Sequence, residues 1–217
     1  MVKRLSAAVL AMLALQFATL AAAQAEEWVE GEHYDTISPA IRGTDADKIE
    51  VTEFFWYGCG HCYNFEPQIT QWKKTLGDDV VVKGSPAMWN GLMQVHAKAF
   101  YTAEALGVLD KVHMPLFQAI NVDRKRLADA DDLGALFAAN GVDREAFEKM
   151  FNSFGVGSQV RQADARARAA RIAGTPELMV AGKYRISTRK AGGQANMLKI
   201  ASYLIEKERA ARSASAS

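Results

Sequence analysis

The motif Cys59-Gly60-His61-Cys62 contains the only two cysteines of this 217-residue chain, and their spacing points to thiol chemistry. The run before it, 49–57, reads as a buried strand, and the run after it, 63–76, reads as a helix. A cysteine at the start of a helix has its thiolate stabilised by free backbone N–H groups and by the helix dipole. The motif therefore predicts a redox site at a strand-to-helix junction.

Three other uses of a cysteine pair suit this chain less well. A structural disulfide closing so short a loop would stabilise the fold by only about 2 kcal/mol, and a chain of this length can bury its own core. A zinc site needs two more ligands, and His33, His96 and His113 form no closely spaced pair. Haem attachment needs a histidine where the chain has Tyr63. We therefore expect redox chemistry and no metal.

The N-terminus has the pattern of an export signal. Lys3 and Arg4 precede an apolar run over 5–20, and an alanine-rich segment ends at Ala25. This is the order of a charged region, an apolar core and a cleavage site, so we predict a signal peptide over 1–25. A retained membrane anchor is the alternative, but polar residues interrupt the apolar run. In an oxidising compartment an ordinary cysteine pair forms a static disulfide, so an exported pair at redox spacing indicates a disulfide used as a reagent.

Charge composition argues against a nucleic-acid partner. The full chain has 26 basic and 25 acidic residues, and removal of 1–25 takes away Lys3 and Arg4 and no acid, which leaves a net charge of −1. A nearly neutral chain gives no electrostatic basis for binding nucleic acid.

The elements that must position the cysteines follow from hydrophobic periodicity and from glycine and proline breaks. The first strand is apolar on both faces, as in a central strand covered by helices. The predicted order is strand 48–57, helix 63–76, strand 80–83, a block of helices, strands 178–180 and 183–186, and helix 194–208.

This order of elements, with a Thr-Pro opening the late β-hairpin, resembles the thioredoxin fold, and the inserted helical block resembles the DsbA family of exported disulfide oxidoreductases. The residues that carry the resemblance are Glu53-Phe54-Phe55, Cys59 to Tyr63, Phe65-Glu66, Gly174-Thr175-Pro176 and Gly182-Lys183-Tyr184. It covers about residues 28–208. It implies an α/β, thioredoxin-like fold built from 26–86 and 174–209, an inserted all-helical domain over 87–173 and a flexible tail over 210–217.

The resemblance also implies a function. We expect a monomeric thiol:disulfide oxidase of the Gram-negative periplasm that donates its disulfide to unfolded exported proteins. It would need no cofactor beyond the Cys59–Cys62 disulfide, and a quinone-linked membrane protein of the DsbB type would reoxidise it. Gly60 replaces the proline common in this family, which leaves an isomerase or reductase of the same fold as an alternative. A non-enzymatic exported binding module is the third possibility.

Roles within the motif follow from position. Cys59 lies at the helix start and should be the exposed nucleophile and leaving group, and Cys62 should be its buried resolving partner. His61 can donate a hydrogen bond to the thiolate or carry positive charge beside it, with a solvated histidine as the alternative.

The resemblance also implies a cis peptide bond between Thr175 and Pro176, next to the two sulfurs. The backbone of Thr175 can pair with an extended substrate.

Two acidic residues complete the predicted site. Glu53 belongs to a buried strand, where an unpaired carboxylate is costly. We expect Lys83 of the neighbouring strand to pair with it, and the resemblance implies an acidic and a basic residue at these positions. Such a carboxylate can relay protons to Cys62, although a purely structural pair is nearly as plausible. Glu66 should lie on the exposed side of its helix and add negative charge.

Overall fold

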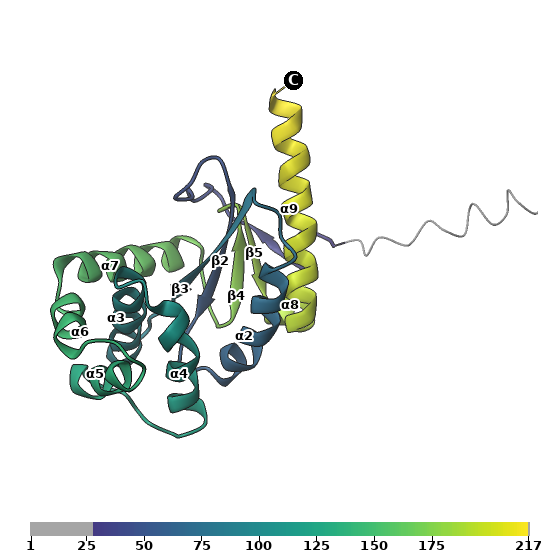
Figure 1. Cartoon of the computed structure of the whole chain (residues 1–217). Coiled ribbons are helices and arrows are strands. Elements are labelled where there is room, and N and C mark those ends of the chain that lie inside the picture. The colour runs from purple at the N-terminus through teal and green to yellow at the C-terminus, as the bar shows by residue number, and fades with distance from the viewer. Residues whose placement is uncertain (1–27, 217) are drawn as a thin grey trace, which may run out of the picture.

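The structure is a computed structural model that describes residues 28–216. The predicted signal peptide lies outside these residues. Five strands form one mixed sheet in the order β1-β5-β4-β2-β3 (Figure 1). Their bounds are β1 Asp35–Thr36, β2 Ile49–Phe55, β3 Val80–Pro86, β4 Glu177–Val180 and β5 Tyr184–Ser187.

The central strand is β2. It pairs in parallel with β3 and antiparallel with β4, and β4 continues through β5 to the edge strand β1. All seven residues of β2 are buried, as the apolar character of both faces predicts. Because β2 leads directly to the cysteine motif, a fully buried strand in the interior of the sheet fixes the position of Cys59.

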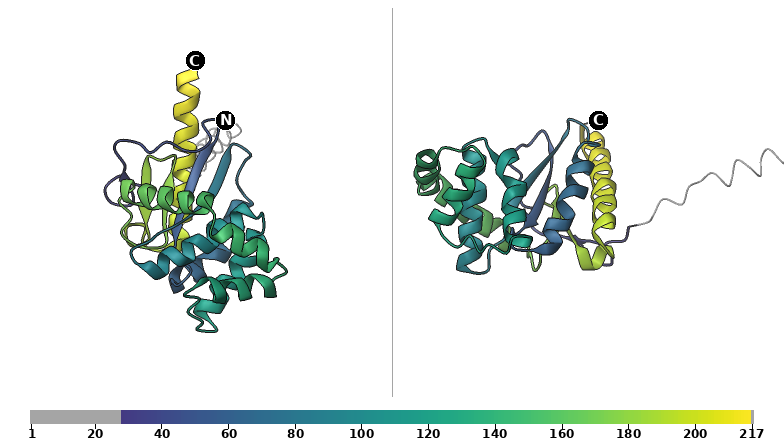
Figure 2. Two further views of the ribbon diagram at one scale, coloured as in Figure 1. Left: turned by 90° about the vertical axis from the view of Figure 1, so that its left-hand side faces the viewer. Right: turned by 60° about the horizontal axis from the view of Figure 1, so that its bottom comes forward.

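Helices cover both sides of the sheet. Figures 1 and 2 show α2 and α9 on one side and a block of helices, α3 to α7, on the other. Their bounds are α2 Gly60–Lys73, α3 Gly91–Ala105, α4 Leu109–Asn121, α5 Ala130–Ala139, α6 Arg144–Phe151, α7 Phe154–Ala169, α8 Thr188–Ala191 and α9 Gln194–Ala216.

The hydrophobic core has two main parts. Apolar residues of α2 and α9 pack against Ile49, Val51 and the hairpin β4–β5. The helical block has its own core, which reaches the sheet through Phe55 and Tyr57. The end of β2 therefore lies where the two cores meet.

The thioredoxin-like fold with a helical insertion is confirmed. The predicted boundaries at 86/87 and 173/174 fall between β3 and α3 and between α7 and β4. Within residues 28–216 no helix is long and apolar enough to cross a membrane.

Two local expectations differ from the structure. The sequence pattern does not predict β1, which is only two residues long and lies in a polar stretch. Where it predicts a flexible tail from residue 210, the structure continues α9 to Ala216, beyond the sheet (Figures 1 and 2). Alanine and arginine favour helix, and Arg212 donates to the backbone oxygens of Asp47 and Lys48 at 3.1 and 2.9 Å.

Candidate active site

The two cysteines sit in different environments at the start of α2. Cys59 is the N-cap residue, with an extended backbone, and is partly exposed. Cys62 lies inside the first turn and is completely buried. Both are free thiols. The Cys59 Sγ lies 3.4 Å from the backbone oxygen of Thr175, and the Thr175–Pro176 bond is cis. The structure thus brings the four residues together as the sequence analysis expects.

These environments shift the pKa values of the two thiols in opposite directions. The pKa of Cys59 is lowered to about 5, first by a hydrogen bond from the Cys62 thiol and then by the Thr175 side chain and the backbone N–H groups of Cys62 and His61. Partial desolvation opposes this shift without cancelling it. The pKa of Cys62 is raised, first by burial and then by the Cys59 sulfur. The accessible sulfur is therefore the thiolate, and the buried sulfur keeps its proton.

The residues between the cysteines are open to solvent. His61 is exposed, and Gln194 of α9 donates to its backbone oxygen at 2.6 Å. Within the described residues, no hydrogen bond or ion pair to the His61 ring is found. A Cβ built on Gly60 would have one neighbour within 4 Å, the Oδ1 of Asn121 at 3.8 Å. The start of α2 therefore has space for a larger residue.

The predicted Glu53–Lys83 pair is wrong, because strand register separates the two side chains. In the parallel pairing of β2 with β3, Lys83 is opposite Thr52, and Gly84 is opposite Glu53. Successive residues of a strand point to opposite faces, so Lys83 lies on the face away from Glu53.

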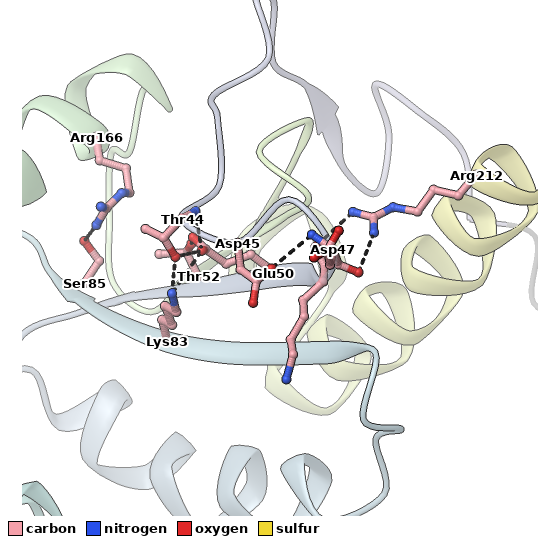
Figure 3. A network of polar contacts seen from close by, with 10 residues as sticks. Thr44, Asp45, Asp47, Glu50, Thr52, Lys83, Ser85, Arg166 and Arg212 are labelled. Atoms are coloured by element: carbon pink, nitrogen blue, oxygen red, sulfur yellow. Dashed lines mark hydrogen bonds and ion pairs between the residues drawn. The ribbon is translucent and has the colours of Figure 1, made fainter. Parts of the chain in front are cut away.

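Lys83 belongs instead to a network near the start of β2 (Figure 3). Its ammonium is 3.4 Å from Glu50 and contacts the Thr44 hydroxyl. Glu50 accepts from the Thr44 hydroxyl and N–H at 2.7 and 3.0 Å, and Figure 3 shows these side chains gathered between the strands and the preceding loop. The network fastens the loop before β2 to the sheet.

Glu66 is buried, which corrects the expectation of an exposed residue. It is 6% exposed, lies 3.4 Å from the Nε2 of His113, and accepts from the Thr70 hydroxyl at 3.1 Å. Residues four apart share a helix face, so Glu66 follows Cys62 into the core. Burial opposes ionisation, but the His113 and Thr70 contacts and the field of Lys73 lower the pKa of Glu66.

Glu53 lies in the same region, and its buried Oε1 has no hydrogen-bonding partner among residues 28–216. Burial, and then the charge of Glu66, raise the pKa of Glu53 to about 8, while Lys73 acts weakly in the opposite direction. Both carboxylates line a cavity of about 290 Å³ together with His113 and Lys73. Burial and the neighbouring carboxylate of Glu66 therefore favour the protonated form of Glu53.

Two residues of the helical block, His113 and Asn121, contribute to the site, and the sequence pattern does not predict them. His113 of α4 accepts from or donates to the Tyr57 hydroxyl at 2.8 Å, besides its contact with Glu66. The Nδ2 of Asn121 donates to the Tyr57 backbone oxygen at 2.8 Å. Because these contacts join segments more than 50 positions apart, no local pattern reveals them.

Among residues 28–216, no group of three or more His, Cys, Asp or Glu side chains could hold a metal ion.

Comparison with known proteins gives related sequences over almost the whole chain. The family model described as a DSBA-like thioredoxin domain matches residues 50–204. The thiol:disulfide interchange protein DsbA of Pseudomonas aeruginosa is 42% identical over 201 residues, which cover 93% of this chain and 95% of that protein. The protein of the same name from Azotobacter vinelandii is 43% identical over 182 residues, with 84% and 85% covered.

Solved structures agree with the sequence relationship. The crystal structure of Pseudomonas aeruginosa DsbA matches with a TM-score of 0.83 at 41% identity, over 86% of this chain and 97% of that chain. The crystal structure of the oxidoreductase DsbA from Xylella fastidiosa matches with a TM-score of 0.80 at 32% identity, over 84% and 98%.

Proposed function

This chain belongs to the DsbA family of thiol:disulfide oxidoreductases, and we propose that it is an exported oxidase that introduces disulfide bonds into newly translocated proteins. The observation that carries the proposal is the opposite shift of the two thiol pKa values across one helical turn. A low pKa makes Cys59 a good leaving group and stabilises the reduced form, so the oxidised form readily gives up its disulfide.

The reaction begins with the oxidised protein. A substrate thiolate attacks the Sγ of Cys59, the Cys59–Cys62 bond breaks, and a mixed disulfide forms. A second substrate thiolate then attacks the substrate sulfur of this mixed disulfide and displaces Cys59. The substrate loses two electrons to the cysteine pair. Of its two protons, one ends on Cys62, whose pKa is raised, and the other is released because Cys59 leaves as a thiolate.

Substrate binding is assigned to Thr175 and Pro176. The backbone oxygen of Thr175 is 3.4 Å from the Cys59 sulfur, so an extended segment paired with Thr175 would carry its own cysteine to the disulfide. Pairing through the backbone needs no particular side chains, which suits an enzyme that acts on many unfolded proteins.

Proton handling is assigned to Glu53, with Glu66 as the second carboxylate that keeps Glu53 protonated. The raised pKa of Glu53 and the cavity that it shares with Glu66 support a route between Cys62 and solvent. Lys83 also borders this cavity, but its ammonium pairs with Glu50, so it is assigned no proton transfer. His61 is assigned the tuning of Cys59 through its imidazole, which can donate to the thiolate or carry positive charge beside it. Its backbone N–H, which any non-proline residue would supply, also lowers the pKa of Cys59.

The cellular setting is part of the proposal. We infer a periplasmic, monomeric protein, exported through the signal peptide predicted over 1–25, with no cofactor beyond its redox-active disulfide. A quinone-linked membrane protein of the DsbB type would accept the two electrons. The alternative activity is disulfide isomerisation by the same site. The dipeptide Gly60-His61 favours this alternative, because it replaces the Pro-containing dipeptide common in the family.

The proposal is tested by mixing the oxidised protein with an equimolar reduced, unfolded protein that contains two cysteines. We expect stoichiometric disulfide formation in the substrate and two free thiols in the enzyme. Cys59→Ser should abolish the transfer, and Cys62→Ser should retain reactivity at Cys59 but transfer no disulfide. An inert wild-type protein would contradict the oxidase function.

A further inference from the structure

The loop that carries Thr175 and Pro176 is held by polar contacts rather than by apolar packing on every side. A hollow of about 280 Å³ borders residues 173–177. Thr188 donates from its hydroxyl to the backbone oxygen of Pro176 at 3.0 Å, which fastens one end of the loop to α8. At the other end, a guanidinium N–H of Arg185 donates to the backbone oxygen of Arg171.

Glu177 fastens the middle of the loop. Its side chain is 6% exposed, and its Oε1 lies 3.6 Å from the Cβ position of Gly174. The backbone N–H groups of Ala173 and Gly174 stabilise the ionised carboxylate, whereas its Oε2 has no hydrogen-bond partner among the described residues. These two residues immediately precede Thr175. The carboxylate, which belongs to the first residue of β4, therefore contacts the backbone of the preceding loop rather than any of its side chains.

Arg185 connects this carboxylate to the edge of the sheet. Its Nε is 3.8 Å from the Oε2 of Glu177, and its Nη2 donates to the Oδ2 of Asp35 at 2.9 Å. Asp35 belongs to β1 and also contacts Lys190. A chain of charges, Asp35–Arg185–Glu177, thus runs from the edge strand to the loop beside Cys59.

We propose that Glu177 is a positioning residue for substrate: with Arg185 behind it, it holds the backbone of Thr175 in the geometry that an extended peptide must meet. This inference rests on the proposed function, since it concerns the binding of the protein substrate in that reaction. Glu177 is not among the residues that lower the pKa of Cys59 in the described structure, and most of those lie in α2, so we expect its effect to fall mainly on substrate binding.

Two substrates separate these effects. A peptide with two cysteines needs the loop for backbone pairing, whereas dithiothreitol is too small to pair with it. For Glu177→Ala we expect the KM for the peptide to rise about tenfold, equivalent to about 1.4 kcal/mol, with kcat nearly unchanged. The rate of dithiothreitol oxidation should stay within about twofold of wild type, because most hydrogen bonds to Cys59 come from α2.

The conservative variant Glu177→Gln retains a carbonyl oxygen that can accept from the loop. We expect the KM of this variant for the peptide to lie close to the wild-type value. Arg185→Lys keeps the positive charge but loses the planar fork of donors, and we expect a smaller KM increase of about threefold. This variant tests the inference through a different residue if Glu177→Ala fails to fold.

Glu208 offers a matched control. It is a buried carboxylate paired with Lys183 at 2.7 Å, on α9 rather than at the loop. Glu208→Gln should leave the peptide KM unchanged. An unchanged KM in Glu177→Ala, a parallel loss with both substrates, or the same KM increase in Glu208→Gln would each overturn the inference. A wild-type protein that oxidises neither substrate would instead remove the proposed function itself.

Discussion

Lys83 and Glu53 lie on opposite faces of the central sheet, although they belong to neighbouring strands and have opposite charges. The register places Thr52 opposite Lys83 and a glycine opposite Glu53. A Cβ on that glycine, Gly84, would lie 2.9 Å from the Phe100 ring, so the position beside Glu53 has no room for a basic side chain. No lysine of β3 therefore compensates this carboxylate, and burial beside the charged Glu66 favours the protonated form of Glu53.

This arrangement predicts an unusual pH dependence of stability. The pKa of Glu53 is raised from the ordinary 4.5 to about 8, so between these values the folded state keeps a proton that the unfolded state has lost. Stability contributed at this site therefore falls as the pH rises from 4.5 to 8. We therefore expect the free energy of unfolding of Glu53→Gln, relative to that of wild type, to be higher at pH 8 than at pH 5 by about 2 kcal/mol or more. Urea unfolding of the two reduced proteins at these pH values measures this difference.

Lys83→Met is the control for that experiment. Because Lys83 pairs with Glu50, this variant should lower the free energy of unfolding by about 1 kcal/mol or less, as expected for an ion pair whose lysine is partly exposed. Its pH dependence between 5 and 8 should match that of wild type. If the free energy of unfolding of Lys83→Met changed differently with pH from that of wild type, the lysine, and not Glu66, would govern the ionisation of Glu53.

The Cys62 thiol contributes most to the acidity of Cys59, which predicts the effect of removing it. In Cys62→Ala the pKa of Cys59 should rise from about 5 by about one unit. Thiolate absorbance in the ultraviolet, recorded from pH 3 to 9, measures this directly, since the variant has a single thiol. An unchanged midpoint would mean that the backbone N–H groups of α2 suffice alone.

Gly60→Pro should be tolerated and should stabilise the protein. Gly60 is the first residue of α2, a position where proline is favoured because its N–H is not needed. No atom lies closer than 3.8 Å to a Cβ built there. Thermal unfolding should show a free energy of unfolding that is higher by about 0.4–1 kcal/mol, because proline reduces the conformational entropy of the unfolded chain. A loss of stability would indicate that the backbone of Gly60 is not free to accept proline.

The sequence predicts the parts of this site that are local or that belong to the family resemblance. The cysteine pair and its helix follow from spacing and periodicity, and Thr175-Pro176 follows from the resemblance. The pairing of Lys83 depends on a one-residue choice of register, which periodicity does not decide in a strand that is apolar on both faces.

Glu66 shows a different kind of failure. Its spacing of four from the buried Cys62 is visible in the sequence and already indicates the buried face, but its charge suggests exposure. His113 leaves no signal at all, because its contacts to Tyr57 and Glu66 arise only when the helical block packs on the sheet.

The central claim is that the low pKa of Cys59 makes the disulfide a strong oxidant. The most direct test is the reduction potential of the Cys59–Cys62 disulfide, measured at pH 7 by equilibration with glutathione and followed by mass spectrometry after alkylation. We predict a value between about −180 and −120 mV, the range from disulfide isomerases to strong oxidases. A value near about −270 mV, typical of a cytosolic reductase such as thioredoxin, would contradict the account.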